Sequence, residues 1–529
     1  MSSTTCGSGS SVSGRSAALL ALVWIAAPER LAGQVVDTVI VDNASVFDDA
    51  DSVWYARLAN LLHIRTRSWL VRRTLLVRSG EPYDSATVAE SERNLRTLGV
   101  FRRVALDTLR LDDGRLAVRA ATGDGWSTKP DIGFSFGGGD GAWSVGLLEE
   151  NFLGTATLAA ITYASTPDRQ SLNLGYKNPH LFARGAPLEL LYSDLSDGTF
   201  GAWYLGVPFT WTGARHSLLT DGTAADRRLL VYRDGLLEQT YQQNLLRFAL
   251  RGGVALAATS REYTRLWVGV EGRREDYALT PVTTLPYSTF ATAGLGVELG
   301  HVRFRVMEHF NAYARGEDVD LSQILRLGVW AAPRAWGYPD DRAGVAPELY
   351  AQLASRWHQG FGRLQLLARG VYVPSAGAVD SGRVRGNVTV VSAALPRQTW
   401  IVFAEAGLAR RPAPNGEFDL WLEGRGPRGF PAHAFTGTRM VWGTIENRIL
   451  VIDDLWGLFG IGLAPFVDWG GAWYDDEPSR IGVTTGLSLR LGSTRSTQGG
   501  AGELALGYRF GEGFSGGAWA LAIRRGFVF

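Results

Sequence analysis

The stretch IGVTTGLSLRL, residues Ile481 to Leu491, alternates between two kinds of side chain. Its odd-numbered positions carry Ile, Val, Thr and Leu, and its even-numbered positions carry Gly, Thr, Ser and Arg. A β-strand sends successive side chains to opposite faces, so this period of two predicts a strand with one apolar face and one small or polar face. A strand that separates lipid from a water-filled lumen needs this pattern.

The same alternation recurs from Trp126 onward, in segments of about ten residues divided by glycine-rich and charged turns. Residues 246–250 and 504–510 are two further clear cases. We therefore predict a transmembrane antiparallel β-barrel of about sixteen strands over residues 126–529. The pattern is weak at residues 210–240 and 375–400, which leaves the strand count open by about two. A soluble β-sandwich or propeller is the alternative.

The last eleven residues, WALAIRRGFVF, resemble the C-terminal signal by which bacterial barrels are recognised for insertion. Phe527 and Phe529 carry this resemblance, whereas Arg524 stands where many such signals have glycine. A soluble protein rarely ends a buried strand without a polar tail. The ending therefore favours the barrel and implies the cell's own barrel-assembly machinery as a partner for its insertion.

Composition and charge argue against three other classes of protein: a disordered chain, a helical membrane protein and a nucleic-acid binder. The chain has 529 residues, of which 46% are hydrophobic and 20% charged, so it is not disordered by composition. After the first 30 residues no apolar run reaches the roughly 18 residues that a membrane-spanning helix needs. The net charge of +1 argues against a nucleic-acid partner, because a phosphate footprint needs a basic surplus.

The first 33 residues have the pattern of a secretory signal peptide. Arg15 precedes the apolar run Ala17–Ala27, and the small residues Ala32 and Gly33 offer a cleavage site before residue 34. A single membrane anchor is the alternative. Cys6, the only cysteine, lies within this segment, so the mature chain has neither a disulfide nor a cysteine metal site.

Residues 34–125 are predicted to form one small α+β domain of β-α-α-β-β order. A β-rich segment at residues 36–41 precedes a short helix that Ser68 can cap and that runs to Leu76. A second helix begins at Asp84 or Ser85 and ends at Gly99; its shared face consists of Val88, Ser91, Leu95 and Leu98. Two alternating strands follow, joined by a hairpin turn at Asp113 and Gly114.

The segment LLVRSGEPYDSATVAESERNLRTLGVFRRVAL, residues 75–106, resembles a POTRA domain. The resemblance lies in an apolar helix end, a glycine, Tyr-Asp, a leucine-rich helix and Gly-x-Phe leading into a strand. It implies a periplasmic module that binds extended polypeptides at a sheet edge, and we expect this edge to comprise Val104, Leu106, Leu116 and Val118. A plug or spacer without a client is the alternative.

Three motifs resemble the BamA/TamA-like superfamily of outer-membrane assembly factors. Arg428-Gly429-Phe430, within GRGPRGFPAHAFTG, resembles the tip of the family's inward-folded lid loop. Glu446 and Arg448 match a Glu-x-Arg pair on the following strand, and FVDWG (Phe466-x-Asp468-x-Gly470) matches a Phe-x-Asp-x-Gly strand. EENFLG, residues 149–154, resembles the family's second barrel strand. Two departures are the single POTRA-like domain and Pro427, which replaces the usual aliphatic residue.

The resemblance implies that Arg428 enters the lumen and pairs with Asp468, with Glu446 and Arg448 as lumen neighbours. A guanidinium suits this role because its planar fork can hold a carboxylate through two hydrogen bonds. Taken alone, each motif can be explained without a functional role, since Arg-Gly-Phe is usually a turn and a lumen aspartate is often solvated. The order and spacing of the motifs together favour membership of the superfamily.

Enzymatic signatures are few. The seven histidines, His63, His180, His216, His301, His309, His358 and His433, form no His-x-x-x-His pair, and we read them as interface or loop residues. The glycine-rich residues 133–141 lack the Lys and Ser/Thr of a phosphate-binding loop, and no Gly-x-Ser-x-Gly elbow occurs. We predict no catalytic residue, metal or cofactor. A barrel hydrolase stays open, because triad residues meet only in space.

The sequence thus predicts a non-enzymatic protein of the outer membrane that assists insertion, assembly or translocation of polypeptides. Its partners would be outer-membrane lipids and unfolded outer-membrane or secreted chains, with the POTRA-like domain in the periplasm and the barrel monomeric. The alternative from a different class is a passive pore or surface antigen without a client.

Overall fold

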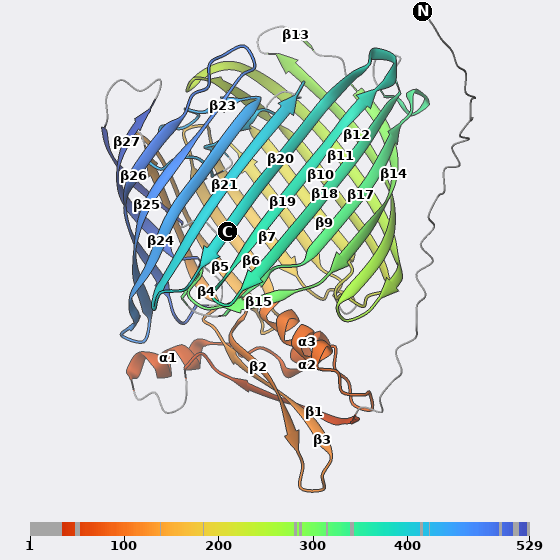
Figure 1. Ribbon diagram of the computed structural model, residues 1–529, viewed down its shortest axis with the longest axis vertical. Coiled ribbons are helices and arrows are strands. Elements are labelled where there is room, and N and C mark those ends of the chain that lie inside the picture. Colours follow the sequence, from red (N-terminus) through yellow and green to blue (C-terminus); the bar gives the residue numbers. More distant parts are fainter. Residues whose placement is uncertain are drawn as a thin grey trace, which may run out of the picture.

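The structure is a computed structural model that describes residues 34–47, 53–137, 139–182, 185–279, 283–284, 288–313, 316–338, 343–412, 416–422, 424–496, 500–511 and 518–525. The predicted signal peptide, residues 1–33, lies outside the described residues. So do Phe527 and Phe529 of the predicted insertion signal. Figure 1 shows two parts, a β-barrel and a smaller N-terminal unit beneath one of its openings. We call that opening the near end and the opposite opening the far end.

The N-terminal unit contains three strands and three helices: β1 (Val36–Ala44), α1 (Trp54–Leu62), α2 (Ser68–Thr74), α3 (Ser85–Thr97), β2 (Phe101–Arg110) and β3 (Leu116–Asp124). Its sheet has the order β1-β3-β2, with β1 parallel and β2 antiparallel to the central strand β3. The predicted hairpin turn is confirmed, since Gly114 has a φ of 80° between β2 and β3.

This sheet order corrects part of the predicted client edge. Leu116 and Val118 lie on β3, which is paired on both sides, and both side chains are buried. Val104 and Leu106 lie on β2, which forms an outer edge of the sheet. Parallel pairing of β1 with β3 joins segments far apart in the chain, and the local pattern of a hairpin does not reveal it.

Helix α3 follows the prediction closely. The Asp84 carboxylate accepts hydrogen bonds from the backbone N–H groups of Ala86 and Thr87, both at 3.1 Å, and Gly99 has a φ of 77° just past the helix end. Helix α2 begins at Ser68 itself, after Arg67, so Ser68 does not cap it. In the described residues no helix has the length and apolar content needed to cross a membrane.

Helix α1 corrects the predicted β-α-α-β-β order to β-α-α-α-β-β. The residue before it, Val53, offers no side-chain hydrogen bond, and the first turn contains no acidic residue. Asp51 and Ser52, just before it in the sequence, are residues that commonly precede a helix, and the prediction did not use them.

The barrel consists of antiparallel strands in a closed sheet. Its long strands are β4 (Thr128–Gly137), β5 (Asp140–Phe152), β6 (Thr157–Ser165), β7 (Gln170–Asn178), β8 (Leu188–Leu195), β9 (Gly198–Val207), β10 (His216–Arg233), β11 (Leu236–Ala258), β12 (Glu262–Leu279), β14 (Ser288–His301), β17 (Gln323–Ala332), β18 (Gly344–Trp357), β19 (Gly360–Val373), β20 (Ala378–Ser392), β21 (Gln398–Arg410), β24 (Arg439–Leu455), β25 (Phe459–Trp473), β26 (Gly482–Ser493), β27 (Gly502–Gly511) and β28 (Ala518–Arg525). The short elements are β13 (Thr283–Thr284), β15 (Phe304–Met307), β16 (Glu317–Asp320), β22 (Phe418–Asp419), β23 (Thr436–Gly437) and two 3-10 turns, η1 (Arg334–Trp336) and η2 (Pro374–Ala376).

The predicted count of about sixteen strands is wrong, because the described residues form twenty long barrel strands. The two segments with a weak pattern contain complete strands, β10 and β20. Several connections are also short; Asp234 and Gly235 alone join β10 to β11. The estimate assigned too much of the chain to loops.

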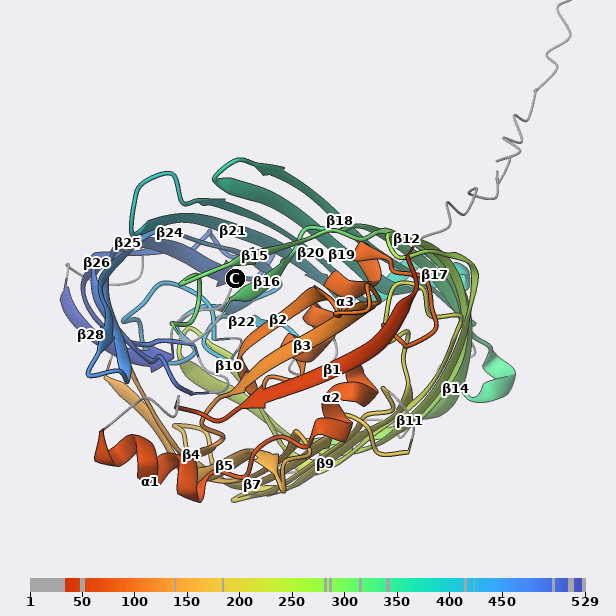
Figure 2. The same cartoon turned by 90° about the horizontal axis from the view of Figure 1, so that it is seen from below.

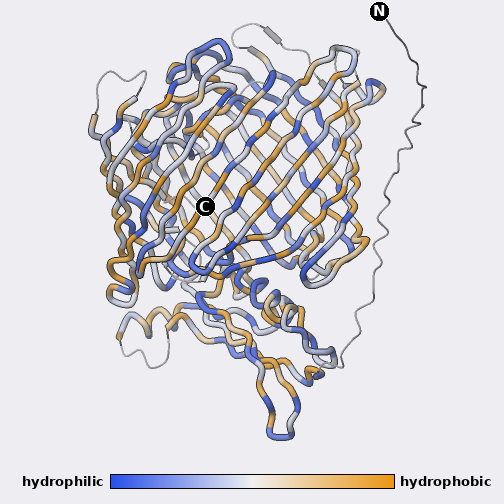
Figure 3. The backbone as a smooth tube through the Cα atoms, viewed as in Figure 1, coloured by the Kyte–Doolittle hydropathy of each residue, from blue (hydrophilic) through white to orange (hydrophobic). Residues whose placement is uncertain are grey.

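Alternation along the strands produces two different barrel faces. On β26 the side chains of Leu487, Leu489 and Leu491 point outward and are exposed, whereas Thr484, Ser488 and Arg490 point inward and are buried. Figure 3 shows hydrophobic and hydrophilic residues alternating along strands all around the barrel. The outer face is therefore apolar and the inner face polar, as the sequence predicts.

The N-terminal unit is docked on the near end of the barrel. Figure 2, viewed from below, shows β1, β2, β3, α2 and α3 lying across this opening. Its core cluster, which includes Leu70, Leu95 and Phe101, also contains Ala156 from the turn between β5 and β6. Hydrogen bonds to four further near-end turns involve the pairs Thr74–His180, Glu90–Thr212, Arg96–Asp318 and Tyr55–Trp456.

The barrel closes where β28 meets β4, and we call this junction the seam. In the described residues the seam has one registered pair, Ile523 with Phe136. On its other side β28 pairs with β27 over eight residues.

Candidate functional site: the lid loop and its ion-pair cluster

Residues 411–438, between β21 and β24, fold into the barrel from the far end; we call them the lid loop. The structure describes them except for residues 413–415 and 423. Strands β22 and β23 pair within the loop. Apolar side chains of the loop pack against β21, β24 and β25 in one buried cluster: Ala409, Phe418, Leu420, Phe430, Ala434, Phe435, Met440 and Ala472. The loop thus has its own core and a defined conformation.

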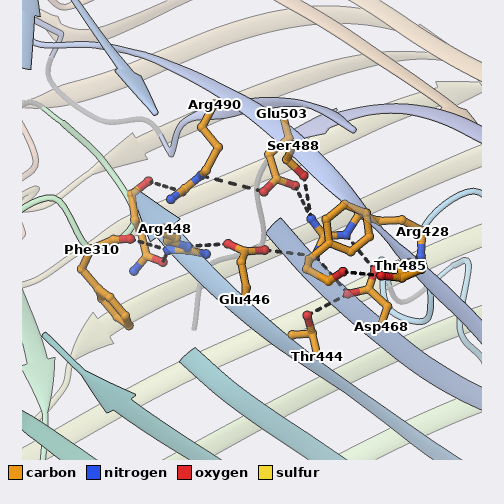
Figure 4. A network of polar contacts seen from close by, with 12 residues as sticks. Phe310, Arg428, Thr444, Glu446, Arg448, Asp468, Thr485, Ser488, Arg490 and Glu503 are labelled. Atoms are coloured by element: carbon orange, nitrogen blue, oxygen red, sulfur yellow. Dashed lines mark hydrogen bonds and ion pairs between the residues drawn. The ribbon is translucent and has the colours of Figure 1, made fainter. Parts of the chain in front are cut away.

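Arg428 extends from the lid loop into a buried set of carboxylates. Its Nε donates to Asp468 Oδ2 at 2.7 Å, and its Nη2 donates to Asp468 Oδ1 and Glu446 Oε2, each at 3.0 Å. Its Nη1 donates to Ser488 Oγ at 3.0 Å, and the guanidinium carbon lies 3.5 Å from the centre of the Phe466 ring. The structure thus brings together Arg428, Asp468 and Glu446 (Figure 4), with Phe466 against the guanidinium; the motifs single out all four residues.

The ion-pair cluster continues beyond Arg428 along the lumen wall. Arg448 Nε donates to Glu446 Oε1 at 2.6 Å, so the two oxygens of Glu446 each accept from a different arginine. Arg490 and Glu503 complete the cluster, with Arg428 Nη1 3.6 Å from Glu503 Oε2. Three arginines therefore face three carboxylates, and all six residues are at most 4% exposed. Buried charges are tolerated when they are paired in this way.

Gly429 is required where it lies. Its φ is 83°, and a Cβ added to it would lie 2.5 Å from the Cβ of Ala520 on β28. Its carbonyl oxygen accepts a hydrogen bond from Arg509 Nη1 at 2.6 Å, and the preceding carbonyl, of Arg428, accepts from Thr484 Oγ1 at 2.7 Å. An arginine followed by glycine lets the backbone approach β28 while the guanidinium turns into the cluster.

Phe430 and Gly470 have packing roles. Phe430 is buried with its ring centre 5.1 Å from that of Phe435, and a Cβ at Gly482 would lie 2.4 Å from the Phe430 ring. A Cβ at Gly470 would lie 3.0 Å from the Trp442 side chain. These glycines make room for aromatic rings on the inner face of the barrel.

The far part of the lid loop is held by His433, a residue that the sequence indicated only as an interface or loop histidine. Its ring contacts Asp168 Oδ1 at 3.0 Å and Asp419 Oδ2 at 2.5 Å, and it stacks on Tyr232 with ring centres 3.6 Å apart. Burial lowers the pKa of His433, but the hydrogen bonds to the two carboxylates outweigh it and raise the pKa to about 9. His433 therefore fastens the loop to the β6–β7 turn and β10.

The sequence also did not single out Phe310 and Asn311. Both come from the connection between β14 and β17, and both accept hydrogen bonds from Arg448, through Phe310 O and Asn311 Oδ1. No local pattern marks them, since 137 residues separate Asn311 from Arg448. From the sequence alone, Arg490 and Glu503 could be recognised only as residues on the polar faces of their strands. In the described residues no group of three or more His, Cys, Asp and Glu is arranged to hold a metal ion.

Comparison with known proteins finds structural likeness alone. The sequence matches no protein-family model and no curated protein. Three solved structures are similar in fold. BamA from Haemophilus ducreyi lacking POTRA domains 1–3 has a TM-score of 0.39 and 12% identity, covering 92% of this chain and 83% of that chain. CdiB from Acinetobacter baumannii has a TM-score of 0.41 and 12% identity, covering 87% and 74%. CdiB from Escherichia coli has a TM-score of 0.40 and 11% identity, covering 95% and 93%.

Proposed function

We propose that the chain is a non-enzymatic outer-membrane barrel of the BamA/TamA-like superfamily that assists insertion, assembly or translocation of polypeptides. Residues 1–33 are its signal peptide, residues 34–125 a POTRA-like periplasmic domain and residues 126–529 the membrane barrel. The apolar outer face supports a place in lipid, because lipid-facing strand positions must be apolar.

One observation carries this proposal: the lid loop contacts both sides of the seam. Gly429 lies against Ala520 of β28, and the backbone N–H of Ala432 donates to Asp140 Oδ2 at 2.8 Å. Asp140 begins β5, the strand next to β4. The loop thus contacts strands on both sides of the junction at which the barrel closes.

The junction at which the barrel closes suits a polypeptide client in physical terms. Strand edges with free N–H and C=O groups are templates for a further strand. Opening of the seam would expose the edges of β4 and β28, and release of the lid loop would remove two contacts that oppose this opening. A passive pore needs neither a fastened seam nor a docked N-terminal unit.

The outer edge of the N-terminal sheet offers clients a first contact. The opposite edge strand, β1, is engaged at its first residue, since Val36 N donates to Glu81 O at 3.0 Å and Gly80 N donates to Val36 O at 2.8 Å. Strand β2 pairs only with β3 among the described strands. We therefore confine the proposed client edge to β2, with Val104 and Leu106 on it.

Site-specific photocrosslinking in cells tests the proposal. A photoreactive residue replaces Asp107, which is exposed on β2, and a control probe replaces Leu61, which is exposed on α1 away from any strand edge. Unfolded outer-membrane or secreted chains should be captured at position 107 and not at position 61. Capture at neither position, with the barrel correctly inserted, would favour the passive pore or surface antigen.

A further inference from the structure

The connection between β14 and β17 forms a hairpin inside the near end of the barrel. Its strands β15 and β16 pair from Phe304 with Asp320 to Met307 with Glu317; residues 314 and 315 lie outside the described residues. Its apolar side chains are buried with inward-facing residues of three barrel strands, in the cluster Met307, Phe310, Val319, Leu321, Phe361, Val391 and Ile401. The hairpin is therefore packed against the inner wall.

The outer end of this hairpin is held by the N-terminal unit. Arg96 on α3 donates to both carboxylate oxygens of Asp318, from Nε at 2.7 Å and from Nη2 at 2.8 Å. The guanidinium of Arg93, one turn earlier on α3, lies 4.1 Å from the centre of the Phe304 ring. Both side chains of the Arg96–Asp318 pair are at most 15% exposed, so this contact is stronger than an ordinary surface ion pair.

The inner end of the hairpin holds the ion-pair cluster. Glu317, next to Asp318, accepts hydrogen bonds from Asn311 N at 2.7 Å, Asn311 Nδ2 at 2.9 Å and Ala312 N at 2.9 Å. These bonds orient Asn311 so that its Oδ1 accepts from Arg448 Nη1 at 3.1 Å. The backbone oxygen of Asn311 accepts from Ala501 N at 3.1 Å. Figure 4 shows Phe310 and Arg448 on the side of the network opposite Arg428.

Contacts therefore run without a break from α3 to the lid loop. The order is Arg96, Asp318, Glu317, Asn311, Arg448, Glu446 and Arg428. Glu446 is the junction, because Arg448 and Arg428 each hold one of its two oxygens. A shift of Arg448 changes the position of this carboxylate, and the carboxylate in turn holds Arg428. Paired groups of this kind, partly buried at Arg96, Asp318 and Glu317 and buried from Asn311 onward, transmit small displacements because they have few alternative arrangements.

We propose that the β15–β16 hairpin couples docking of the N-terminal unit at the near end to retention of the lid loop at the far end. The coupling rests on the proposed function in one respect: a client on the N-terminal unit would be the natural cause of undocking. Undocking would free Asp318, loosen the hairpin and weaken the hold of Arg448 on Glu446. Coupling between two sites is reciprocal, so lid release would also weaken docking.

The test measures how fast a maleimide reacts with a cysteine placed in the lid loop. Ala434 is 6% exposed in the loop's core, so Ala434→Cys reacts only when the loop opens. Cys6 is the only native cysteine, and Cys6→Ser removes it where the signal peptide is retained. Purified full-length protein in detergent micelles is used without any client. Asp318→Asn and, separately, Asn311→Ala should each raise the labelling rate at least about fivefold.

A matched control separates this coupling from general loosening of the near end. Arg397, in the near-end connection between β20 and β21, holds Asp453 near the end of β24 through two hydrogen bonds, at 2.9 and 3.2 Å. Asp453→Asn makes the same chemical change as Asp318→Asn outside the chain of contacts and should leave the labelling rate unchanged. Arg96→Gln is the second variant; it alters only the N-terminal unit, keeps the barrel intact and should reproduce the effect of Asp318→Asn.

The double variant Asp318→Asn/Asn311→Ala should react no faster than the faster single variant, because both changes interrupt one path. Additive effects, or unchanged labelling in both Asp318→Asn and Arg96→Gln, would overturn the coupling. Because no client is present, this result is independent of the capture experiment at position 107. Failed capture with accelerated labelling would reject the proposed function and leave the coupling standing.

Discussion

Arg428 and Asp468 are joined by three hydrogen bonds, one from the backbone N–H and two from the guanidinium of Arg428, at distances from 2.7 to 3.1 Å. Forty residues separate them in the chain. The carboxylate thus fixes both the side chain and the backbone of the loop tip. Because Asp468 binds both the backbone and the side chain of Arg428, this one residue can keep the tip of a long loop inside the barrel.

Replacing Arg428 by alanine should release the lid loop. Asp468, Glu446 and Glu503 would face one another without their shared cation, and breaking such a buried pair costs about 3–5 kcal/mol. Conductance in planar bilayers should rise. Arg428→Lys should not restore the native conductance, because an ammonium cannot reproduce the guanidinium fork.

Arg439→Ala is the control for this change. Arg439 lies at the end of the same loop and pairs with Asp475 at 2.7 Å, but both side chains are at least 41% exposed. This variant should conduct like the unaltered protein. An unchanged channel in Arg428→Ala would show that the arginine does not retain the loop.

Gly429→Ala should destabilise the loop tip more than Gly424→Ala. Both glycines have positive φ, 83° and 62°, so both substitutions carry backbone strain of about 1–3 kcal/mol. Only at Gly429 would the new Cβ meet a neighbour, Ala520; at Gly424 nothing lies within 4 Å. Thermal unfolding of the two variants isolates the contact with β28, and equal melting temperatures would refute it.

The hold of His433 on the lid loop should weaken as the pH rises. In the folded protein the pKa of His433 is raised from 6.5 to about 9, so its contribution to stability is complete below pH 6.5 and is lost as the pH passes through 9. Burial raises the pKa of Asp168, but its hydrogen bonds to His433 and Tyr232 outweigh this and leave it below 3.8. That contribution is present above pH 3.8 and is lost as the pH falls further.

Conductance should therefore increase between pH 6.5 and about 9. His433→Gln cannot become charged, so this variant should conduct more at pH 6.5 and respond less to pH. A conductance independent of pH in the unaltered protein would exclude a role of His433 in holding the loop.

Sequence reasoning identified the part of the site that short motifs carry. Arg428, Glu446 and Asp468 stand at spacings that resemble a known pattern, and the structure brings them into contact. Asn311 and His433 have no such context. Their partners lie on other strands and turns, and only the closed barrel brings them together.

The features of the fold also divide into those marked by local sequence and those that depend on distant partners. Helix α3 was predictable because Asp84 and Gly99 mark both of its ends. Helix α1 has no capping side chain, and the central place of β3 depends on its pairing with the distant β1. The predicted strand count was wrong because the count depends on turn lengths, and the alternation of apolar and polar residues along strands contains no information about turn lengths.

Photocrosslinking at the seam tests the central claim most directly. Phe136 on β4 lies at the seam and is paired with Ile523 of β28, whereas Phe248 on β11 lies away from the seam, between β10 and β12; both rings are exposed on the outer face, by 44% and 48%. A photoreactive phenylalanine at each position changes the side chain little. The account predicts capture of unfolded outer-membrane or secreted polypeptides at position 136 and none at position 248. Polypeptide capture that is absent from position 136, or equal at the two positions, would contradict it.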